Sequence, residues 1–325
     1  MKIRSASVVA LAAVILVGCA TNIETGNKRN PTYQYAHGAS ADQQTAVQRY
    51  REAAERGSTT AQAKLGDMYR KGFGVPQDYE EAARWYLLAT EQGSDRVRHE
   101  LAHMYEEGQG VTRDDAEAVR LMKASAQGGN SGAQAHMARR YKEGRGVPQD
   151  YEEAARWLRL ATGQGNNWAG HSLAHLYEEG RGVPQDDAEA VSLMKAAAEA
   201  GNPSAQAHMG ERYEAGHGVP QDYEAAENWY RRGAEGGDII AQKGLGAMYL
   251  NGVGVDRNRV QAPKWLAIAL NTGRNMSEDY RKHIRAEIDE ATSLLAQAKQ
   301  AMTPGEIAEA EKQAAAWIAK HEKAE

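Results

Sequence analysis

Two histidines one helical turn apart, His99 and His103, stand in the segment HELAH, with Glu100 directly after the first of them. In zinc proteases this His-Glu-x-x-His pattern places two imidazoles on one helix face as metal ligands and supplies the glutamate as a general base. A catalytic zinc also needs a third protein ligand and an open coordination position. No downstream motif offers that ligand at a recognisable spacing, so the zinc-hydrolase hypothesis lacks its main requirement.

A second histidine pair weakens the catalytic interpretation further. The segment HSLAH contains His171 and His175, 72 residues after the first pair, and has Ser172 in place of the glutamate. The chain also has no Gly-x-Ser-x-Gly elbow for a serine nucleophile. We therefore predict no catalytic residue, no cofactor and no specific metal site, although histidines at i and i+4 can hold an incidental metal ion.

The elements that position these histidines follow from an internal repeat. The motif GVPQD begins at Gly74, Gly146, Gly182 and Gly218, and the degenerate copies GVTRD and GVDRN begin at Gly110 and Gly254. Neighbouring copies lie 36 residues apart. Six repeats therefore follow in register, starting at residues 58, 94, 130, 166, 202 and 238.

Each repeat is expected to form two helices joined by a tight turn. In the first copy Ser58 is placed to cap a helix, and Gly72 and Gly74 end that helix and permit the turn. Asp78 then caps the second helix, with Glu81 at the capping-box spacing. Every copy but the last has this aspartate, so we interpret the Asp/Glu pairs as helix caps and not as a general acid and base.

The apolar residues of each copy fall on one face of each helix, as a buried face requires. In the first copy they are Ala61, Leu65, Met68 and Tyr69 in the first helix, and Ala82, Trp85 and Ala89 in the second. Copies one, three and five have a tryptophan at the Trp85 position, whereas copies two and four have a leucine. This alternation indicates duplication of a two-repeat unit, and we expect it in the core rather than in an aromatic binding box.

The first copy, AQAKLGDMYRKGFGVPQDYEEAARWYLLATEQG (residues 61–93), resembles the Sel1-like repeat family, whose helical hairpins are related to tetratricopeptide repeats. It contains the family's Leu-Gly, Gly-x-Gly-Val and Ala-x-x-Trp-Tyr landmarks. The resemblance, over residues 46–273, implies an all-α fold: an α-solenoid, wound as a right-handed superhelix, that binds other proteins and usually lacks catalysis. We expect six 36-residue hairpins within residues 43–275, preceded by an N-terminal half-repeat at residues 43–57.

The C-terminal part departs from the repeat. Pro263 falls inside the second helix of copy six, and the period is lost afterwards. Residues 277–300 are predicted to form one long polar helix, and Thr303 with Glu306 predicts a capping box for another. Residues 276–325 therefore resemble the helical cap that closes many bacterial members of this family.

The N-terminal segment, residues 1–18, has a basic start and an apolar run too short to span a membrane, as in a secretory signal peptide. Leu16-Val17-Gly18-Cys19 resembles the lipobox of bacterial lipoproteins, in which the cysteine carries a diacylglyceryl group. The resemblance makes Cys19 the lipid attachment site, and Ala20 after it implies a periplasmic protein anchored to the outer membrane. The alternative is an ordinary signal peptide with an incidental cysteine. Residues 19–42 are predicted to be a flexible tether.

Partner contacts are expected on the first helices, because in this family they line the concave side of the solenoid. A net charge of −5 argues against nucleic acid, so we expect another protein as the partner. Variable polar positions off the apolar face form what we call the polar ladder: Asp67, Lys71, His99, His103, Glu107, Arg139, Glu143, His171, His175, Glu179 and Glu211. Trp168, which lies outside the repeated core position, is a further candidate contact. The alternative for each residue is a merely solvated helix face.

Three functions are compatible with these features. The first is a non-catalytic, lipid-anchored periplasmic binder; family members of this kind include immunity proteins that neutralise toxin lipases delivered by type VI secretion, and this is the role we predict. The second is an envelope scaffold or a virulence adaptor that contacts host proteins. The third, a zinc hydrolase acting through HELAH, has the least support from the residues.

Overall fold

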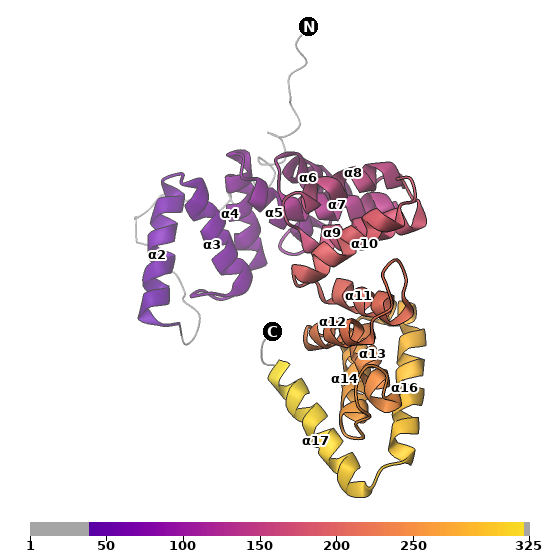
Figure 1. Ribbon diagram of the computed structural model, residues 1–325. Helices are drawn as coiled ribbons and strands as arrows, with labels where there is room; N and C mark the ends of the chain where they lie inside the picture. Colours follow the sequence, from indigo (N-terminus) through magenta and orange to yellow (C-terminus); the bar gives the residue numbers. More distant parts are fainter. Residues whose placement is uncertain (1–38, 322–325) are drawn as a thin grey trace.

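The computed structural model describes residues 39–321 of the chain. Within this range the regular elements are the helices α2 to α17, and no strand occurs. Figure 1 shows the helices following an arc, from α2–α4 through α5–α10 to α11–α17. The predicted all-α solenoid is confirmed. Among the described residues, no helix combines the length and the apolar character needed to cross a membrane.

Six helical hairpins form the body of the molecule. Their first helices are α3 (Thr59–Lys71), α5 (Asp95–Glu107), α7 (Ser131–Glu143), α9 (Asn167–Glu179), α11 (Pro203–Ala215) and α13 (Ile239–Asn251). Their second helices are α4 (Tyr79–Glu91), α6 (Asp115–Gln127), α8 (Tyr151–Thr162), α10 (Asp187–Glu199), α12 (Tyr223–Glu235) and α14 (Gln261–Asn275). The remaining helices are α2 (Ala41–Glu55) before the hairpins, and α15 (Glu278–His283), α16 (Arg285–Gln300) and α17 (Pro304–His321) after them.

Two glycines with left-handed backbone make the turn within each hairpin. In the second hairpin Gly108 ends α5 with φ +69°, and Gly110 follows with φ +67°, a conformation that favours glycine. Gly110 also lies against the preceding repeat, since a Cβ built on it would stand 2.0 Å from the Tyr79 carbonyl oxygen. The second glycine is therefore required for its backbone conformation and for the close contact between repeats.

The contact made by this second glycine alternates along the solenoid. At Gly182, as at Gly110, a built Cβ would meet the backbone of a tyrosine, here Tyr151 at 2.2 Å. At Gly146 and Gly218 it would instead meet a valine methyl group, 2.9 Å away in both cases. The interfaces between hairpins are thus of two kinds that follow one another, in agreement with the two-repeat period of the sequence.

The helix caps follow the prediction with two differences. Asp78 accepts a hydrogen bond from the Glu81 N–H at 3.0 Å, and the aspartates of later copies cap in the same way. The Glu81 carboxylate bonds to Arg84 and not back to the cap, because the Asp78 N–H already donates to the Tyr69 carbonyl at 2.9 Å. Ser94, which occupies the position of Ser58 in the second copy, makes no side-chain cap hydrogen bond at the start of α5.

The core lies between the first and second helices and combines large side chains with many buried alanines. Trp85, Trp157 and Trp265 are at most 8% exposed, as predicted for core positions, whereas Trp229 is partly buried. Val75 is completely buried beside the turn of the first hairpin. Small residues between the large ones allow the close helix packing that stabilises an interior without disulfides.

The C-terminal helices cover the last hairpin but differ from the prediction. Residues 277–300 form two helices rather than one, because Ile284 leaves helical geometry and buries its side chain against α13 and α14. Pro263 lies in the first turn of α14, where a proline is tolerated. Thr303 and Glu306 form the predicted capping box ahead of α17.

Candidate functional site

Ion pairs between neighbouring repeats join the first helices of the solenoid. These pairs include Arg96–Asp67 between α5 and α3, Arg140–Glu106 between α7 and α5, and Arg212–Glu178 between α11 and α9. The polar sides of these three pairs of neighbouring first helices therefore contact each other. We call the polar sides of the first helices, taken together, the polar surface.

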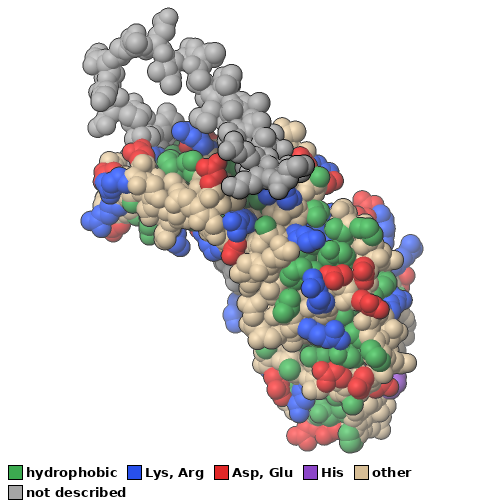
Figure 2. Space-filling model, turned by 90° about the horizontal axis from the view of Figure 1, so that it is seen from above, with side chains coloured by type: hydrophobic (Ala, Val, Ile, Leu, Met, Phe, Trp, Pro, Cys, Tyr) green, Lys and Arg blue, Asp and Glu red, His purple; other side chains and the backbone are tan. Residues whose placement is uncertain are grey.

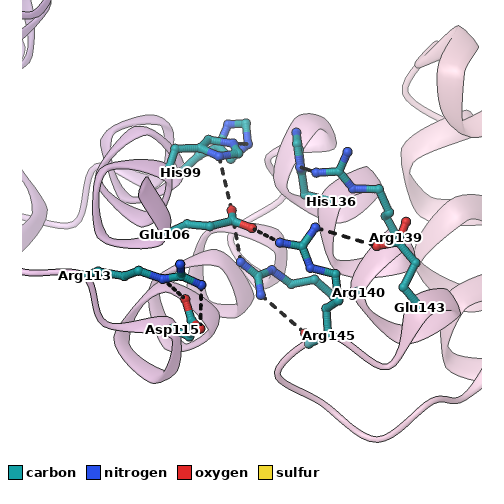
Figure 3. A network of polar contacts seen from close by, with 10 residues as sticks. His99, Glu106, Arg113, Asp115, His136, Arg139, Arg140, Glu143 and Arg145 are labelled. Carbon is teal, nitrogen blue, oxygen red and sulfur yellow. Dashed lines mark hydrogen bonds and ion pairs between the residues drawn. The ribbon is translucent and has the colours of Figure 1, made fainter. Parts of the chain in front are cut away.

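Glu106 is the centre of the best-connected part of this surface (Figure 3). Its carboxylate contacts Arg140 at 3.1 Å and Arg145 at 3.3 Å, and lies 3.6 Å from Nδ1 of His103. Arg140 is only 6% exposed, and a buried guanidinium left without a partner costs several kcal/mol. Glu106 therefore holds α7 against α5.

Asp67, the first residue of the polar ladder, is engaged inside the first two repeats. Its carboxylate accepts hydrogen bonds from the Tyr86 hydroxyl at 2.7 Å and from Arg96 at 3.2 Å. Burial and this carboxylate raise the pKa of Tyr86 above its usual range. Asp67 thus contributes to packing between the first two hairpins and is less available to a partner than predicted.

Three histidines from two repeats meet between α5 and α7. The Nε2 atoms of His99 and His103 are 3.2 Å apart, and the ring of His136 lies 5.2 Å and 4.6 Å from theirs, centroid to centroid. Arg139 donates to Nδ1 of His136 at 3.2 Å (Figure 3). No sequence motif places a third histidine beside HELAH at a recognisable spacing, but the next first helix brings His136 next to the pair.

An equivalent cluster lies two repeats further on, between α9 and α11. The Nε2 atoms of His171 and His175 are 3.3 Å apart, and the ring of His208 lies 5.4 Å and 5.0 Å from theirs. Nδ1 of His175 bonds to Glu178 at 2.8 Å, and Nδ1 of His208 bonds to Glu211 at 3.0 Å. All three histidines repeat those of the first cluster at a spacing of 72 residues, a signal that is present in the sequence.

The environment of four of these rings favours the neutral imidazole. The pKa is lowered to about 4 for His99 and His175 and to about 3 for His136 and His171. In each case burial is the largest cause and repulsion by a neighbouring imidazolium is the next. At pH 7 these rings are therefore uncharged, and each has a lone pair on one nitrogen.

Other predicted contact residues lie at the solvent-exposed rim. Four exposed side chains occupy the last position of successive first helices: Lys71, Glu107, Glu143 and Glu179. The last two pair with arginines of the following loops. Trp168 is 38% exposed near the start of α9. Cys19 and the signal segment lie outside the described residues.

Basic and acidic side chains are mixed on the surface rather than gathered by sign. Figure 2 shows Lys and Arg side chains interspersed with Asp and Glu over the face in view. That face has no extended basic patch of the kind that binds nucleic acid. The mixture agrees with the small net charge of −5 and leaves a protein as the expected partner.

Comparison with known families gives matches along most of the chain. The Sel1 repeat family model matches residues 32–58, 59–94, 98–130, 131–166, 171–202, 203–238 and 239–273. It therefore counts seven segments, and the first of them includes all of residues 43–57, where the sequence predicts a half-repeat. A search of curated proteins gave no match.

Several solved structures are similar to this chain. A Sel1 repeat protein from Oxalobacter formigenes is 29% identical over 69% of this chain and 99% of its own, with a TM-score of 0.65. The protective antigen c5321 of uropathogenic Escherichia coli is 28% identical over 86% of this chain and 72% of its own, with a TM-score of 0.37. Immunity protein Pa5087 from Pseudomonas aeruginosa is 20% identical over 70% of this chain and 82% of its own, with a TM-score of 0.43.

Proposed function

Because this chain belongs to the Sel1 repeat family, we propose that it is a lipid-anchored periplasmic immunity protein, a solenoid that binds and neutralises a toxin lipase. Binding of other proteins is the activity typical of such repeats, and the concave surface of a solenoid suits it. The anchor, the compartment and the lipase are the specific parts of this proposal. The anchor and the compartment rest on the N-terminal sequence, and the lipase as partner is tested by binding and by survival of a deletion strain.

The observation that carries the binding function is the polar surface along the first helices. Ion pairs and buried polar contacts fix its backbone, so its exposed groups are held in place before a partner arrives. Three glutamates, Glu107, Glu143 and Glu179, lie exposed at the same position of successive repeats. Such a row provides negative charge at regular intervals, and complementary basic side chains on a partner would be steered toward it.

The anchor and compartment are supported by the N-terminal sequence, which has a short apolar run followed by Leu16-Val17-Gly18-Cys19. A diacylglyceryl group on Cys19 would hold the solenoid at a membrane surface. An enzyme that attacks lipids must come to such a surface, so a tethered binder would meet it there. An inhibitor of this kind needs only to cover the lipase active site and requires no catalytic group of its own.

A binding measurement with matched charge reversals tests the surface. The purified chain should bind the lipase effector encoded beside its gene and suppress its activity on lipid vesicles. Replacing Glu107, Glu143 and Glu179 together by lysine should weaken binding at least about tenfold, since each reversal of a rim charge removes attraction and adds repulsion. The control is the same change at the exposed last residues of three second helices, Glu91, Glu199 and Glu235.

The control variant should bind as the wild type does. Equal weakening by both triple variants would show a general charge effect and would remove the first-helix surface from the proposal. In cells, a deletion strain should be killed by a sibling that delivers the lipase, and Cys19→Ser should lose the lipid label and protect less. Survival of the deletion strain would contradict the immunity role.

A further inference from the structure

The two histidine clusters are not used by the proposed function, which depends on exposed charges. Each cluster takes two histidines one turn apart from one first helix and a third from the next repeat. In each, the candidate ligand atoms lie within 4.8 Å of one another. The clusters are His99, His103 and His136, and His171, His175 and His208. Three half-buried imidazoles that converge twice in one chain require an explanation beyond a solvated helix face.

The separation of the facing nitrogens matches the geometry of a tetrahedral metal site. Zinc bound to imidazole at about 2.0–2.1 Å places two ligand nitrogens about 3.3–3.4 Å apart. The Nε2 atoms of His171 and His175 are 3.3 Å apart, and those of His99 and His103 are 3.2 Å apart. A single shared proton could explain one such pair, but it would not explain why a third imidazole points to the same place.

The second cluster also has the outer hydrogen bonds typical of metal-binding histidines. A ligating imidazole usually donates its other N–H to a carboxylate, which fixes the ring and leaves the facing nitrogen unprotonated. Nδ1 of His175 lies 2.8 Å from Glu178, and Nδ1 of His208 lies 3.0 Å from Glu211. With protons on Nδ1, both Nε2 atoms keep the lone pair that a metal ion needs.

The first cluster differs at two outer contacts. Glu106 lies 3.6 Å from Nδ1 of His103, farther than the 2.8 Å between Glu178 and Nδ1 of His175. Arg139 occupies the repeat position of Glu211 and donates to Nδ1 of His136 at 3.2 Å. An Nδ1 that accepts this hydrogen bond leaves the proton on Nε2, so neither nitrogen of His136 keeps a free lone pair. The guanidinium also adds a positive charge beside the position of a cation. Both effects weaken metal binding at this cluster relative to the second.

We propose that His171, His175 and His208 bind one zinc ion between α9 and α11, and that His99, His103 and His136 form a second zinc site of lower affinity. Three imidazole ligands leave the fourth position of a tetrahedral ion open. Beside the tighter site a surface hollow of ≈220 Å³ is lined by residues that include His175, His208 and Arg212. Water can fill the open position from this side.

Zinc titration of the metal-free full chain, purified without a histidine tag, tests the proposal. Isothermal titration in competition with a chelator of known affinity should resolve two sites per chain, one tighter than the other. His208→Ala should lose the tighter site and His136→Ala the weaker one, each with an unchanged circular dichroism spectrum. His217→Ala is the control, because His217 lines the same hollow but lies outside the cluster.

A second experiment tests for a gain in zinc affinity and therefore does not depend on damaging a site. Arg139→Glu gives the first cluster the outer carboxylate of the second, and it should tighten the weaker site about 10–100-fold. Cobalt bound in place of zinc should show the intense visible absorption of a tetrahedral ion, and His208→Ala should reduce it. Uptake of less than one zinc per chain, or equal zinc binding by the wild type and His208→Ala, would overturn the proposal.

Discussion

The contact between Gly110 and the preceding repeat sets the cost of a Gly110→Ala substitution. A Cβ at this position would stand 2.0 Å from the Tyr79 carbonyl oxygen and 2.6 Å from the Glu80 nitrogen, whereas ordinary contacts begin near 3.4 Å. These backbone atoms belong to the first turn of α4 and cannot rotate aside as the end of a side chain can. The first two hairpins would therefore have to move apart.

Two costs combine in this variant. A Cβ on left-handed backbone costs about 1–2 kcal/mol. Overpacking in a close-packed interface costs about 1–3 kcal/mol more. We expect Gly110→Ala to lower the free energy of unfolding by about 2–5 kcal/mol. Gly129→Ala isolates the first cost, because Gly129 has φ +95° and nothing lies within 4 Å of its built Cβ. Gly146→Ala should fall between them, since its Cβ would meet a mobile methyl group.

Urea unfolding followed by circular dichroism measures the three losses, and the spectra without urea check that each variant is folded. The expected order of destabilisation is Gly110→Ala, then Gly146→Ala, then Gly129→Ala. Equal losses for Gly110→Ala and Gly129→Ala would refute the reasoning. In that case the backbone conformation alone would set the cost, and the close approach between repeats would contribute nothing.

Three further predictions concern pH, a buried arginine and a helix cap. The metal-free protein should lose stability as the pH falls from 6.5 toward 4, because His171, with a pKa of about 3, stays neutral in the folded state while the unfolded chain takes up a proton. The loss is limited to about 1.4 kcal/mol per pH unit for each such histidine. A urea midpoint that stays constant over this pH range would contradict the prediction. Arg140→Met should lower the free energy of unfolding by about 1–3 kcal/mol, because Glu106 loses its buried partner Arg140 and keeps only the exposed Arg145. As a control, Arg84→Met at an exposed ion pair should cost less than about 1 kcal/mol. Ser94→Asn should raise the melting temperature, because the asparagine provides the missing side-chain cap of α5, worth about 0.5–1 kcal/mol. An unchanged melting curve would show that the first turn of α5 accepts no side-chain cap.

The fold could be predicted because the same local signals recur along the chain, with only the capping aspartate missing from the last copy. The glycine pair, the capping aspartate and the apolar face that begins at Ala61 each indicate the same hairpin, and the structure contains that hairpin six times. Agreement among independent local signals is what makes a sequence specify one structure. The signals end with the repeat, which is why the break at Ile284 was not predicted. Burial against α13 and α14 decides that break, and no periodic pattern encodes it.

The third histidine of each cluster was missed for a different reason. Aligning the copies in 36-residue register compares equivalent positions, whereas contacts between repeats join positions that are not equivalent. His99 and His136 are 37 residues apart, so the register places His136 in the column of Glu100. Only the stacking of α7 on α5 brings these rings together. The partners of half-buried residues such as Asp67 and Arg140 could not be predicted for the same reason.

The two alternating interfaces imply that this solenoid keeps the type of every junction only if its length changes in steps of 72 residues. Deleting residues 110–181 would bring Gly182 against Tyr79, and the junction would again be a glycine on a tyrosine backbone. Deleting residues 110–145 would instead place Gly146, which fits against a valine, on that tyrosine. The longer deletion would also leave His99 and His103 beside His208, so that the shortened molecule keeps one complete cluster. Shorter and longer relatives built on this plan should therefore gain or lose span and histidine clusters together, one cluster for every two hairpins.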